Sequence, residues 1–342
     1  MKRFLTLVIF FTFFLEGNSQ NIDLHGVKLM FWNVENVFDT MDDPQTEDND
    51  FLPAGTMRWN DSRYWKKIND IYKTIIAAGE WTTPDVVAFC EIENRKVLQD
   101  IIYDTPLSRF EFGIIHEDSP DERGIDVCLI YRQDRLELAS YKYFAPDGVS
   151  RNQLGSRTIL YAKLRAGKDT VHLFCNHWPS RIGGVLAGEE LRQKLASTVK
   201  RKADSIYLSS KGRAKIIISG DFNCTPAEKE IRILTQNPEG APIVNLSSRF
   251  VSEGTGTYRY KGTWEMIDQV MVSEYLISCN EGLYADMQSM KIFSPFFLLT
   301  KDADYPGLTP FSMYRGRRYR GGVSDHLPVL VDLGMWPDSV QE

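Results

Sequence analysis

The chain has 342 residues, of which 43% are hydrophobic and 25% charged, and its formal net charge is −6. This composition is that of a globular protein and excludes a disordered or fibrous chain. The acidic balance argues against a protein that coats nucleic acid through a broad basic surface, but it is compatible with an enzyme that binds phosphates locally.

The N-terminal segment has the pattern of a secretory signal. Lys2 and Arg3 precede an apolar run over residues 4–15, and the small residues Gly17 and Ser19 precede a cleavage site that we place after Ser19. The run is shorter than the about 20 residues that a transmembrane helix needs. We therefore expect the signal peptide (1–19) to be removed and the mature protein to be periplasmic or secreted, without a transmembrane anchor. A buried N-terminal strand or helix is the alternative interpretation.

Ten short segments have the composition of β-strands. Several are continuous apolar runs, as expected for strands covered on both faces, and others alternate between apolar and polar residues. They are residues 27–34, 85–93, 110–117, 126–132, 136–144, 157–164, 170–178, 214–222, 264–273 and 326–333.

Three amphipathic segments predict helices between these strands. Apolar residues recur at helical spacing in residues 63–79 and 188–208. A shorter helix is predicted over 227–235, with Thr225 as its cap and Pro226 at the first helical position. Many strands with a few helices predict two packed sheets with helices outside. Because the chemical motifs described below are spread over the whole chain, we expect residues 20–342 to form a single domain.

Five cysteines occur in the chain, mostly in or just beyond apolar strands: Cys90, Cys128, Cys175, Cys224 and Cys279. Export permits disulfides, but an odd number at these positions favours small buried side chains over a disulfide framework. No CxxC pair is present, so a structural zinc site of that type has no support.

Two polar segments stand apart from the predicted strands. Residues 39–50 are strongly acidic and predict a solvated loop, with a calcium loop as the alternative, although the pattern of an EF-hand is incomplete. Residues 301–322 are rich in Gly, Pro, aromatic residues and Arg, and predict a long loop of the kind that is often functional.

Acids and amides follow the apolar strands. Asp221 and Asn223 come at the end of one strand and, because alternate strand residues point the same way, we expect them to share a face. Glu91 and Glu93 end another strand with the same spacing. Acids are costly to bury unless they are paired or bind a cation, and magnesium prefers carboxylate and amide oxygens. The alternative for each pair is a solvated strand end.

Histidines add acid–base chemistry to this set. His177 ends a strand, and His172 lies five residues earlier, a separation that places the two rings on opposite faces and argues against a shared metal. A neutral His can take a proton from water if a carboxylate orients it. Asp268 and Asp325 are both candidates for that carboxylate.

Seven motifs in this order resemble the endonuclease/exonuclease/phosphatase superfamily. They are WNVEN, FCEIEN, GIDVCLIYR, NHWPSR, SGDFN, MIDQVMV and SDHLPV. The resemblance covers roughly residues 27 to 333, and the NHWPSR segment resembles the bacterial exported members more than the eukaryotic nucleases. It implies an α/β fold: a four-layered α/β/β/α sandwich of two packed, mostly antiparallel sheets flanked by helices.

The resemblance also implies roles for the matching residues. Glu91 would be the principal ligand of a Mg²⁺ ion, with Mn²⁺ or Ca²⁺ as alternatives. Asn33 would contact the metal or hold its ligands, and Asp325 would be a second carboxylate on the metal side. Asp221 would orient or activate the attacking water, and Asn223 would hold the scissile phosphate.

The two histidines complete the implied site. His177 would contact the phosphate or act as an acid. Asp268 would pair with His326, which would be the general base or a phosphate clamp. Glu93 lies beyond the motif and is left outside the site. Gln269 departs from the family pattern, and the departure leaves open which side chain steers the leaving group.

Other motif residues have less defined roles. Arg123 and Arg181 are candidates for phosphate contact because arginine binds phosphate with two hydrogen bonds, and surface salt bridges are the alternative for both. Asp126 and Tyr131 are expected to be structural or to shape the substrate site.

The predicted function is a divalent-metal-dependent phosphoester hydrolase that uses in-line attack of a water molecule. Its partner would be a phosphate-ester substrate, and the Arg-rich segment 315–320 favours a phosphodiesterase acting on nucleic acid. The alternative is an esterase for lipid headgroups or small molecules, of the sphingomyelinase or inositol-phosphatase kind. A catalytically silent binding domain is a third reading, which the complete set of acids and histidines disfavours.

Overall fold

Two β-sheets pack face to face in this computed structural model, which describes residues 26–80, 83–146, 148–149, 158–181, 188–236 and 240–337. The predicted signal peptide (1–19) lies outside the described residues. The first sheet has the order β13-β19-β1-β2-β4-β3, with β14 beside β19. Its strands are β13 (Leu283–Tyr284), β19 (Val329–Met335), β1 (Val27–Val37), β2 (Val86–Ile92), β4 (Asp126–Arg132), β3 (Phe112–Ile115) and β14 (Met290–Ile292).

The second sheet has the order β5-β6-β7-β8-β12-β9. Its strands are β5 (Glu137–Phe144), β6 (Ile159–Ala166), β7 (Asp169–His177), β8 (Lys215–Asp221), β12 (Asp268–Ser273) and β9 (Ile243–Asn245). In the two sheets only β1–β2 and β7–β8 pair in parallel among the described strands; the other pairs are antiparallel.

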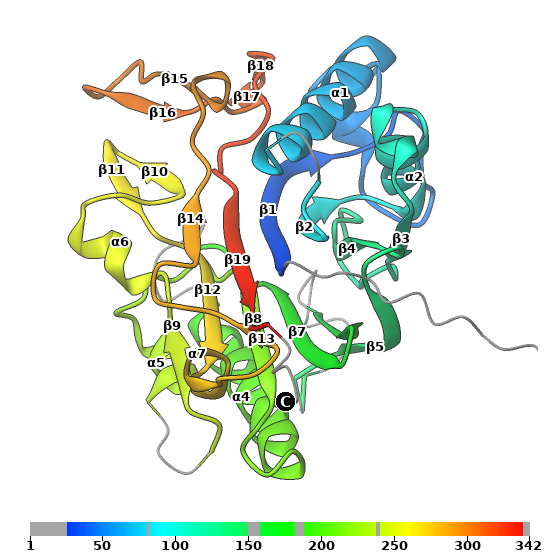
Figure 1. Cartoon of the computed structure of the whole chain (residues 1–342). Coiled ribbons are helices and arrows are strands. Elements are labelled where there is room, and N and C mark those ends of the chain that lie inside the picture. Colours follow the sequence, from blue (N-terminus) through cyan, green and yellow to red (C-terminus); the bar gives the residue numbers. More distant parts are fainter. Residues whose placement is uncertain are drawn as a thin grey trace, which may run out of the picture.

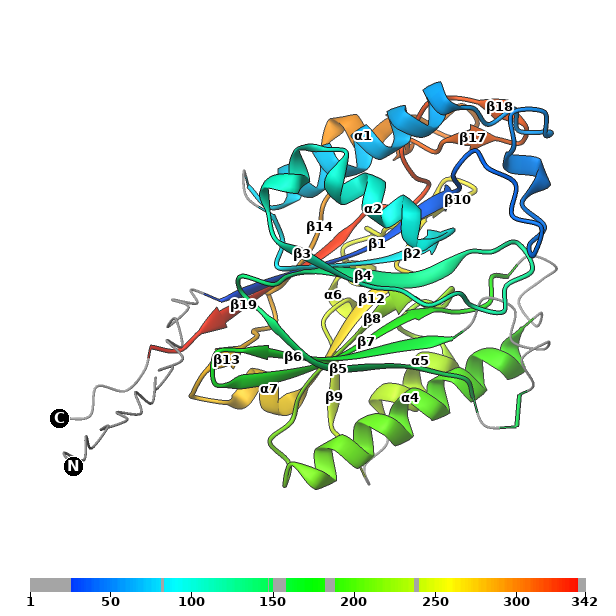
Figure 2. The same cartoon turned by 90° about the vertical axis from the view of Figure 1, so that its right-hand side faces the viewer.

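Helices cover the outer face of each sheet, which gives the four layers that Figure 2 shows edge-on. Helices α1 (Asp61–Ala78) and α2 (Arg95–Tyr103) cover the first sheet, and α4 (Glu189–Ser209) and α5 (Lys229–Thr235) cover the second. Two one-turn helices, α6 (Ser248–Ser252) and α7 (Glu274–Ser278), lie in connections. The predicted α/β/β/α sandwich is confirmed. None of the helices in the described residues has the length and apolar character to cross a membrane.

Strand alternation explains why the sequence shows continuous apolar runs. In β1, Leu29 and Phe31 face the second sheet, whereas Met30 and Trp32 face α1 and α2. In β8, Ile217 faces the first sheet and Ile216 faces α4. Both faces of these strands are therefore buried, as expected for sheets with one helical and one sheet neighbour.

Three short hairpins project at one end of the sandwich (Figure 1). They are β10 (Tyr258–Tyr260) with β11 (Thr263–Glu265), β15 (Leu299–Lys301) with β16 (Leu308–Pro310), and β17 (Tyr314–Arg315) with β18 (Arg318–Tyr319). The expectation of one long loop over 301–322 is therefore wrong, because this segment contains paired strands. The expected strand 264–273 is likewise divided, since β11 ends at Glu265 and β12 begins at Asp268.

The predicted helices differ from the observed ones mainly at their ends. Asn60 caps α1 by accepting a hydrogen bond from the Arg63 amide. The predicted start of the third helix is wrong, because α5 begins only after Glu228. There the Glu228 carboxylate accepts hydrogen bonds from both the backbone amide and the hydroxyl of Thr225, which holds this segment in a turn. Helix α2 was not predicted.

The five cysteines are buried, as expected. The acidic segment 39–50 lies in a loop that ends in a 3-10 turn, Asn49–Phe51. The loop is not wholly solvated, because Asp48 is buried within it and its carboxylate accepts a hydrogen bond from the Asp43 amide.

Candidate active site

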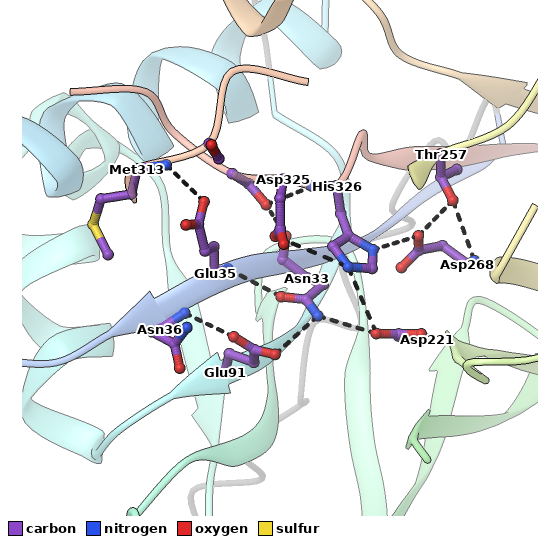
Figure 3. A network of polar contacts seen from close by, with 12 residues as sticks. Asn33, Glu35, Asn36, Glu91, Asp221, Thr257, Asp268, Met313, Asp325 and His326 are labelled. Carbon is purple, nitrogen blue, oxygen red and sulfur yellow. Dashed lines mark hydrogen bonds and ion pairs between the residues drawn. The ribbon is translucent and has the colours of Figure 1, made fainter. Parts of the chain in front are cut away.

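The predicted site residues meet at one edge of the sandwich, where the two parallel strand pairs end. Figure 3 shows six of them from close by: Asn33, Glu91, Asp221, Asp268, Asp325 and His326. In the second sheet the register places His177 and Asp268 on either side of Asp221. Asn33 comes from β1 and Glu91 from β2 of the first sheet. Because the sheets pack face to face, these strand ends bring together residues far apart in the chain, such as Asn33 and Asp221, which are 188 positions apart and in contact.

Asn33 is the bridge between the two sheets. Its Nδ2 donates to Glu91 Oε1 at 3.2 Å and to Asp221 Oδ2 at 3.1 Å, and its Oδ1 accepts from the Glu35 amide at 3.0 Å. The side chain is buried, so its orientation is defined by these three partners. The amide nitrogen, not the oxygen, therefore faces the carboxylates.

A carboxylate binds one ring nitrogen of His326, and the other ring nitrogen faces the site. Its Nδ1 lies 2.7 Å from Asp268 Oδ2, which also accepts the Thr257 hydroxyl proton. Its Nε2 faces the site, 3.9 Å from Asp221 Oδ2 and 3.9 Å from Asp325 Oδ1. A carboxylate on Nδ1 orients the ring and stabilises its protonated form.

His177 lies on the other side of Asp221. Its Nε2 is 3.8 Å from Asp221 Oδ2 and 3.7 Å from Glu91 Oε1. Two imidazoles thus flank one buried carboxylate, which gives the site both proton acceptors and proton donors.

Several site residues have unusual backbone conformations. Glu91 has a φ of 68°, at a register shift where β2 pairs with β4, and Asn223 has a φ of 48°. Non-glycine residues in this region are uncommon and cost free energy, so such residues concentrate at functional sites. At Glu91 the shift turns the carboxylate toward Asn33 and the Asn36 amide, which donates to Oε2 at 2.9 Å.

Comparison with known proteins agrees with this geometry. A model of the Endonuclease/Exonuclease/phosphatase family matches residues 28–335. The chain belongs to this family. Its members are phosphoester hydrolases, so this chain is assigned to that general class of enzyme. No curated protein matches the chain.

Solved structures share the fold at low sequence identity. A family member from Bacteroides vulgatus superposes with a TM-score of 0.55 at 18% identity, covering 90% of this chain and 98% of that one. A Bacteroides thetaiotaomicron mannosyl-6-phosphatase gives 0.56 at 16% identity, covering 90% and 99%. TDP2 of D. rerio, in complex with a single-strand DNA product, gives 0.53 at 13% identity, covering 90% and 99%. At these identities the likeness is one of fold.

The family's enzymes generally depend on a divalent metal, and the donors here fit one. The carboxylates of Glu91, Asp221 and Asp325 gather with no Arg or Lys in ion-pair contact within the described part of the chain. Ligand atoms of Asp221, Asp268 and His326 lie within 4.8 Å of one another. In addition, Asp268 Oδ1 is buried without a hydrogen-bond partner. Such a group of oxygen donors suits a hard cation such as Mg²⁺.

Protonation in the site is shared between Asp221 and His326. Burial raises the pKa of Asp221 to about 7, with His326 opposing the rise and Asp268 adding to it. Burial alone would lower the pKa of His326, but the carboxylates of Asp268, Asp221 and Asp325 raise it well above its usual value. The two groups therefore titrate as a coupled pair, in which His326 is the more basic member.

Asn223 lies beside Asp221, but not for the predicted reason. Strand β8 ends at Asp221, so strand alternation does not reach Asn223. Instead the chain turns, and the Asn223 amide donates to Asp221 Oδ1 at 3.0 Å, while Nδ2 donates to the Trp178 carbonyl at 3.0 Å.

Three other predicted residues have partners elsewhere. Glu93 does not join Glu91, since its carboxylate accepts hydrogen bonds from the Asp39 amide and the Asn94 side chain. Arg123 lies at the surface with Asp121, 3.4 Å away. Arg181 donates to the Asn223 carbonyl at 2.7 Å and pairs with Glu228, so it supports the turn that carries Asn223.

The remaining motif residues are structural. Asp126 is buried and pairs with His116 Nε2 at 2.8 Å, and Tyr131 lies in the core between the sheets. His172 points away from the site and bonds the Tyr161 hydroxyl at 2.8 Å. Gln269 is buried, where it donates to the Cys224 carbonyl at 2.5 Å and accepts from the Asn245 side chain at 2.7 Å.

Sequence reasoning missed several residues that support the site. Thr257 bonds Asp268 from a separate hairpin, and no signal in the sequence links the two. Ser324 donates to the Asn33 carbonyl at 2.7 Å and accepts from the His326 amide at 3.0 Å. Glu35, which lies in the WNVEN motif, accepts from the Met313 amide at 2.7 Å.

Proposed function

We propose that this protein is a divalent-metal-dependent phosphoester hydrolase that cleaves phosphodiesters, nucleic acids first among them, by in-line attack of a water molecule. One observation supports this above the others. Asp221 lies within 4 Å of two imidazole Nε2 atoms and of the Asn33 amide, at 3.8, 3.9 and 3.1 Å. A general base with donors around it is what transfer of a phosphoryl group requires.

The cation would be held by Glu91, with Asp325 on the same side, and Mg²⁺ fits these oxygen donors best. When bound, the cation draws charge from a phosphoryl oxygen. Asn33 presents its Nδ2 to Glu91 and therefore acts by orienting this ligand.

Asp221 accepts the proton of the attacking water, since a pKa of about 7 suits a base near neutral pH. His326, protonated and oriented by Asp268, donates from Nε2 to a phosphoryl oxygen. His177 contributes a second donor on the opposite side of Asp221. Asn223 uses one amide hydrogen on Trp178 and keeps the other for the scissile phosphate. Removing one such group is expected to lower turnover by about 100- to 1000-fold.

A second candidate is a phosphoesterase for lipid headgroups or small molecules. The net charge of −6 is less suited to long nucleic acids, and one solved structure of similar fold is a mannosyl-6-phosphatase.

A phosphoester screen of the mature protein separates these functions. The panel contains plasmid DNA, RNA, oligonucleotides, sphingomyelin, inositol phosphates and sugar phosphates, each with Mg²⁺, Mn²⁺, Ca²⁺ or a chelator. We expect chelator-sensitive cleavage that Glu91→Ala and His326→Ala abolish. Turnover of sugar or lipid phosphates without oligonucleotide cleavage would select the second candidate. Activity that survives in the double variant would disprove the assigned site.

We also propose that residues 1–19 are removed and that residues 20–342 form one exported domain. The charged, apolar and small residues of the N-terminus support this proposal. The mass of the protein recovered from the periplasm or medium of expressing cells tests it, and an intact N-terminus in the cytoplasm would refute it.

A further inference from the structure

A polar cavity of about 240 Å³ lies between the projecting hairpins and reaches the active site. Its walls come from β10 and the turn after it, from the β15–β16 hairpin and from the segment that carries β17–β18. Figure 1 labels these strands. The cavity is smaller than the roughly 300–1000 Å³ typical of sites that enclose a whole small ligand. It therefore suits one group of a larger substrate.

Two residues join this cavity to the catalytic residues. Asp325 lines it directly, and so does Tyr258. The Tyr258 ring packs on the His326 ring with centroids 4.9 Å apart, and the two residues form a backbone bridge. A substrate group in the cavity would thus be next to the group that reacts.

The charges of the cavity divide into paired and unpaired groups. Arg259 lies 3.2 Å from Asp302 and donates to three backbone carbonyls, and Arg315 pairs with Asp304. Arg320 also lines the cavity but forms no ion pair with a carboxylate in the described residues. The acids of the outer wall are therefore neutralised, and Arg320 remains available for an anion.

Arg320 is held in a defined position. Its guanidinium lies 5.6 Å from the centroid of the Phe311 ring, and its amide donates to the Met313 carbonyl at 2.9 Å. Behind it, a Cβ on Gly322 would lie 1.9 Å from the Phe311 carbonyl oxygen, so only glycine permits this close approach. Met313 is in turn bonded to Glu35 beside the active site. Stacking on an aromatic ring leaves the edge N–H groups of an arginine free to donate.

We propose that Arg320 binds a second phosphate of the substrate, adjacent to the scissile one, and so determines specificity. The inference rests on the proposed hydrolase function. A guanidinium presents paired donors that match a phosphate, and the polar walls disfavour an apolar group. The second phosphate could belong to the next nucleotide of a strand or to a small bisphosphate, and the two sources share this chemistry.

Matched substrate pairs test the proposal. The nucleotide pair is TpT and pTpT, which share the scissile diester and differ by one terminal phosphate. The small-molecule pair is inositol 4-phosphate and inositol 4,5-bisphosphate, in which the second phosphate is on the neighbouring ring carbon. The variants are Arg320→Gln, Arg320→Lys and, as the control, Arg317→Gln at an exposed position of the same hairpin outside the cavity.

We expect the wild type to prefer the member with two phosphates through a lower KM, in whichever pair it cleaves. Arg320→Gln should reduce this preference by about 10- to 100-fold, as expected when a charged hydrogen-bonding pair is lost. Arg320→Lys should retain part of it, and Arg317→Gln all of it. Equal losses on both members of a pair, or a preference that survives Arg320→Gln, would overturn the proposal.

A further experiment distinguishes failure of the proposed hydrolase function from failure of the proposed anion site. If neither pair is cleaved, calorimetry measures binding of inorganic pyrophosphate to chelator-treated wild type and Arg320→Gln. Binding that depends on Arg320 would support the anion site without the hydrolase, and absence of binding to the wild type would overturn it.

Discussion

The pairing of Asp268 with His326 leads to a quantitative prediction for Asp268→Asn. The amide oxygen of Asn can keep the hydrogen bonds to His326 Nδ1 and to Thr257, while its nitrogen takes the place of the unpartnered Oδ1. The substitution therefore removes the charge and preserves the shape of the pair.

The magnitude follows from the geometry of this pair. Two unit charges about 4 Å apart interact by roughly 4 kcal/mol at an effective dielectric constant near 20, and the substitution removes this attraction. The pKa of His326 should therefore fall, although Asp221 and Asp325 still face the ring and keep part of the rise. Protonated His326 is the active form, so activity is lost as pH rises through this pKa. The alkaline limb of the pH profile should therefore move to lower pH, and kcat should fall about 100- to 1000-fold.

The assay is a pH profile of kcat on the best substrate from the phosphoester screen. Asp126→Asn is a matched control, because Asp126 pairs with His116 at 2.8 Å in a buried position outside the site. That variant should lose stability but keep the profile of the wild type. If Asp268→Asn retained kcat within about threefold and an unchanged alkaline limb, the role assigned to the pair would be wrong.

Three further predictions concern the metal, the support of the site and the stability. Glu91→Gln should raise the Mg²⁺ concentration for half-maximal activity by at least about tenfold, and an unchanged requirement in a metal titration would contradict the assignment of this ligand. The buried Nζ of Lys67 donates to the backbone carbonyls of Glu35 and Val323, which lose this partner in Lys67→Met. This substitution should lower the free energy of unfolding by about 2–4 kcal/mol in urea denaturation. A loss below about 1 kcal/mol would argue against the stabilising role of these two hydrogen bonds. Burial lowers the pKa of His172 to about 4 in the folded protein, below its value near 6.5 in the unfolded chain. Between these two pH values the unfolded state binds more protons than the folded state. The free energy of unfolding should therefore fall as the pH drops from about 6.5 to 4. The His172→Gln variant should lack about 1–2 kcal/mol of this fall in the free energy of unfolding, after allowance for the partly exposed ring. An identical pH dependence of stability in the wild type and the variant would refute this prediction.

Much of the fold could be predicted because the pattern of apolar residues in a short segment indicates which of its faces are buried. The apolar runs of β1, β2, β7 and β8 and the stripe of α1 reflect which faces are covered, and these are properties of short segments. Errors arose where a tertiary contact overrides the local signal. The α5 start is set by Glu228 and Thr225, and the hairpins of 299–319 form by pairing that composition does not reveal.

The candidate site divides in the same way. The sequence determined which residue types follow the buried strands, and the order of its motifs predicted that Asn33, Glu91, Asp221, Asp268 and His326 would act together. Only the tertiary structure decided which atoms meet: the turn of Asn33 Nδ2 toward two carboxylates, the support of Asp268 by Thr257, and the distance of Glu93 from the site. These contacts join segments far apart in the chain. They depend on strand register, on the positive φ of Glu91 and on the packing of two sheets, none of which a short stretch of sequence encodes.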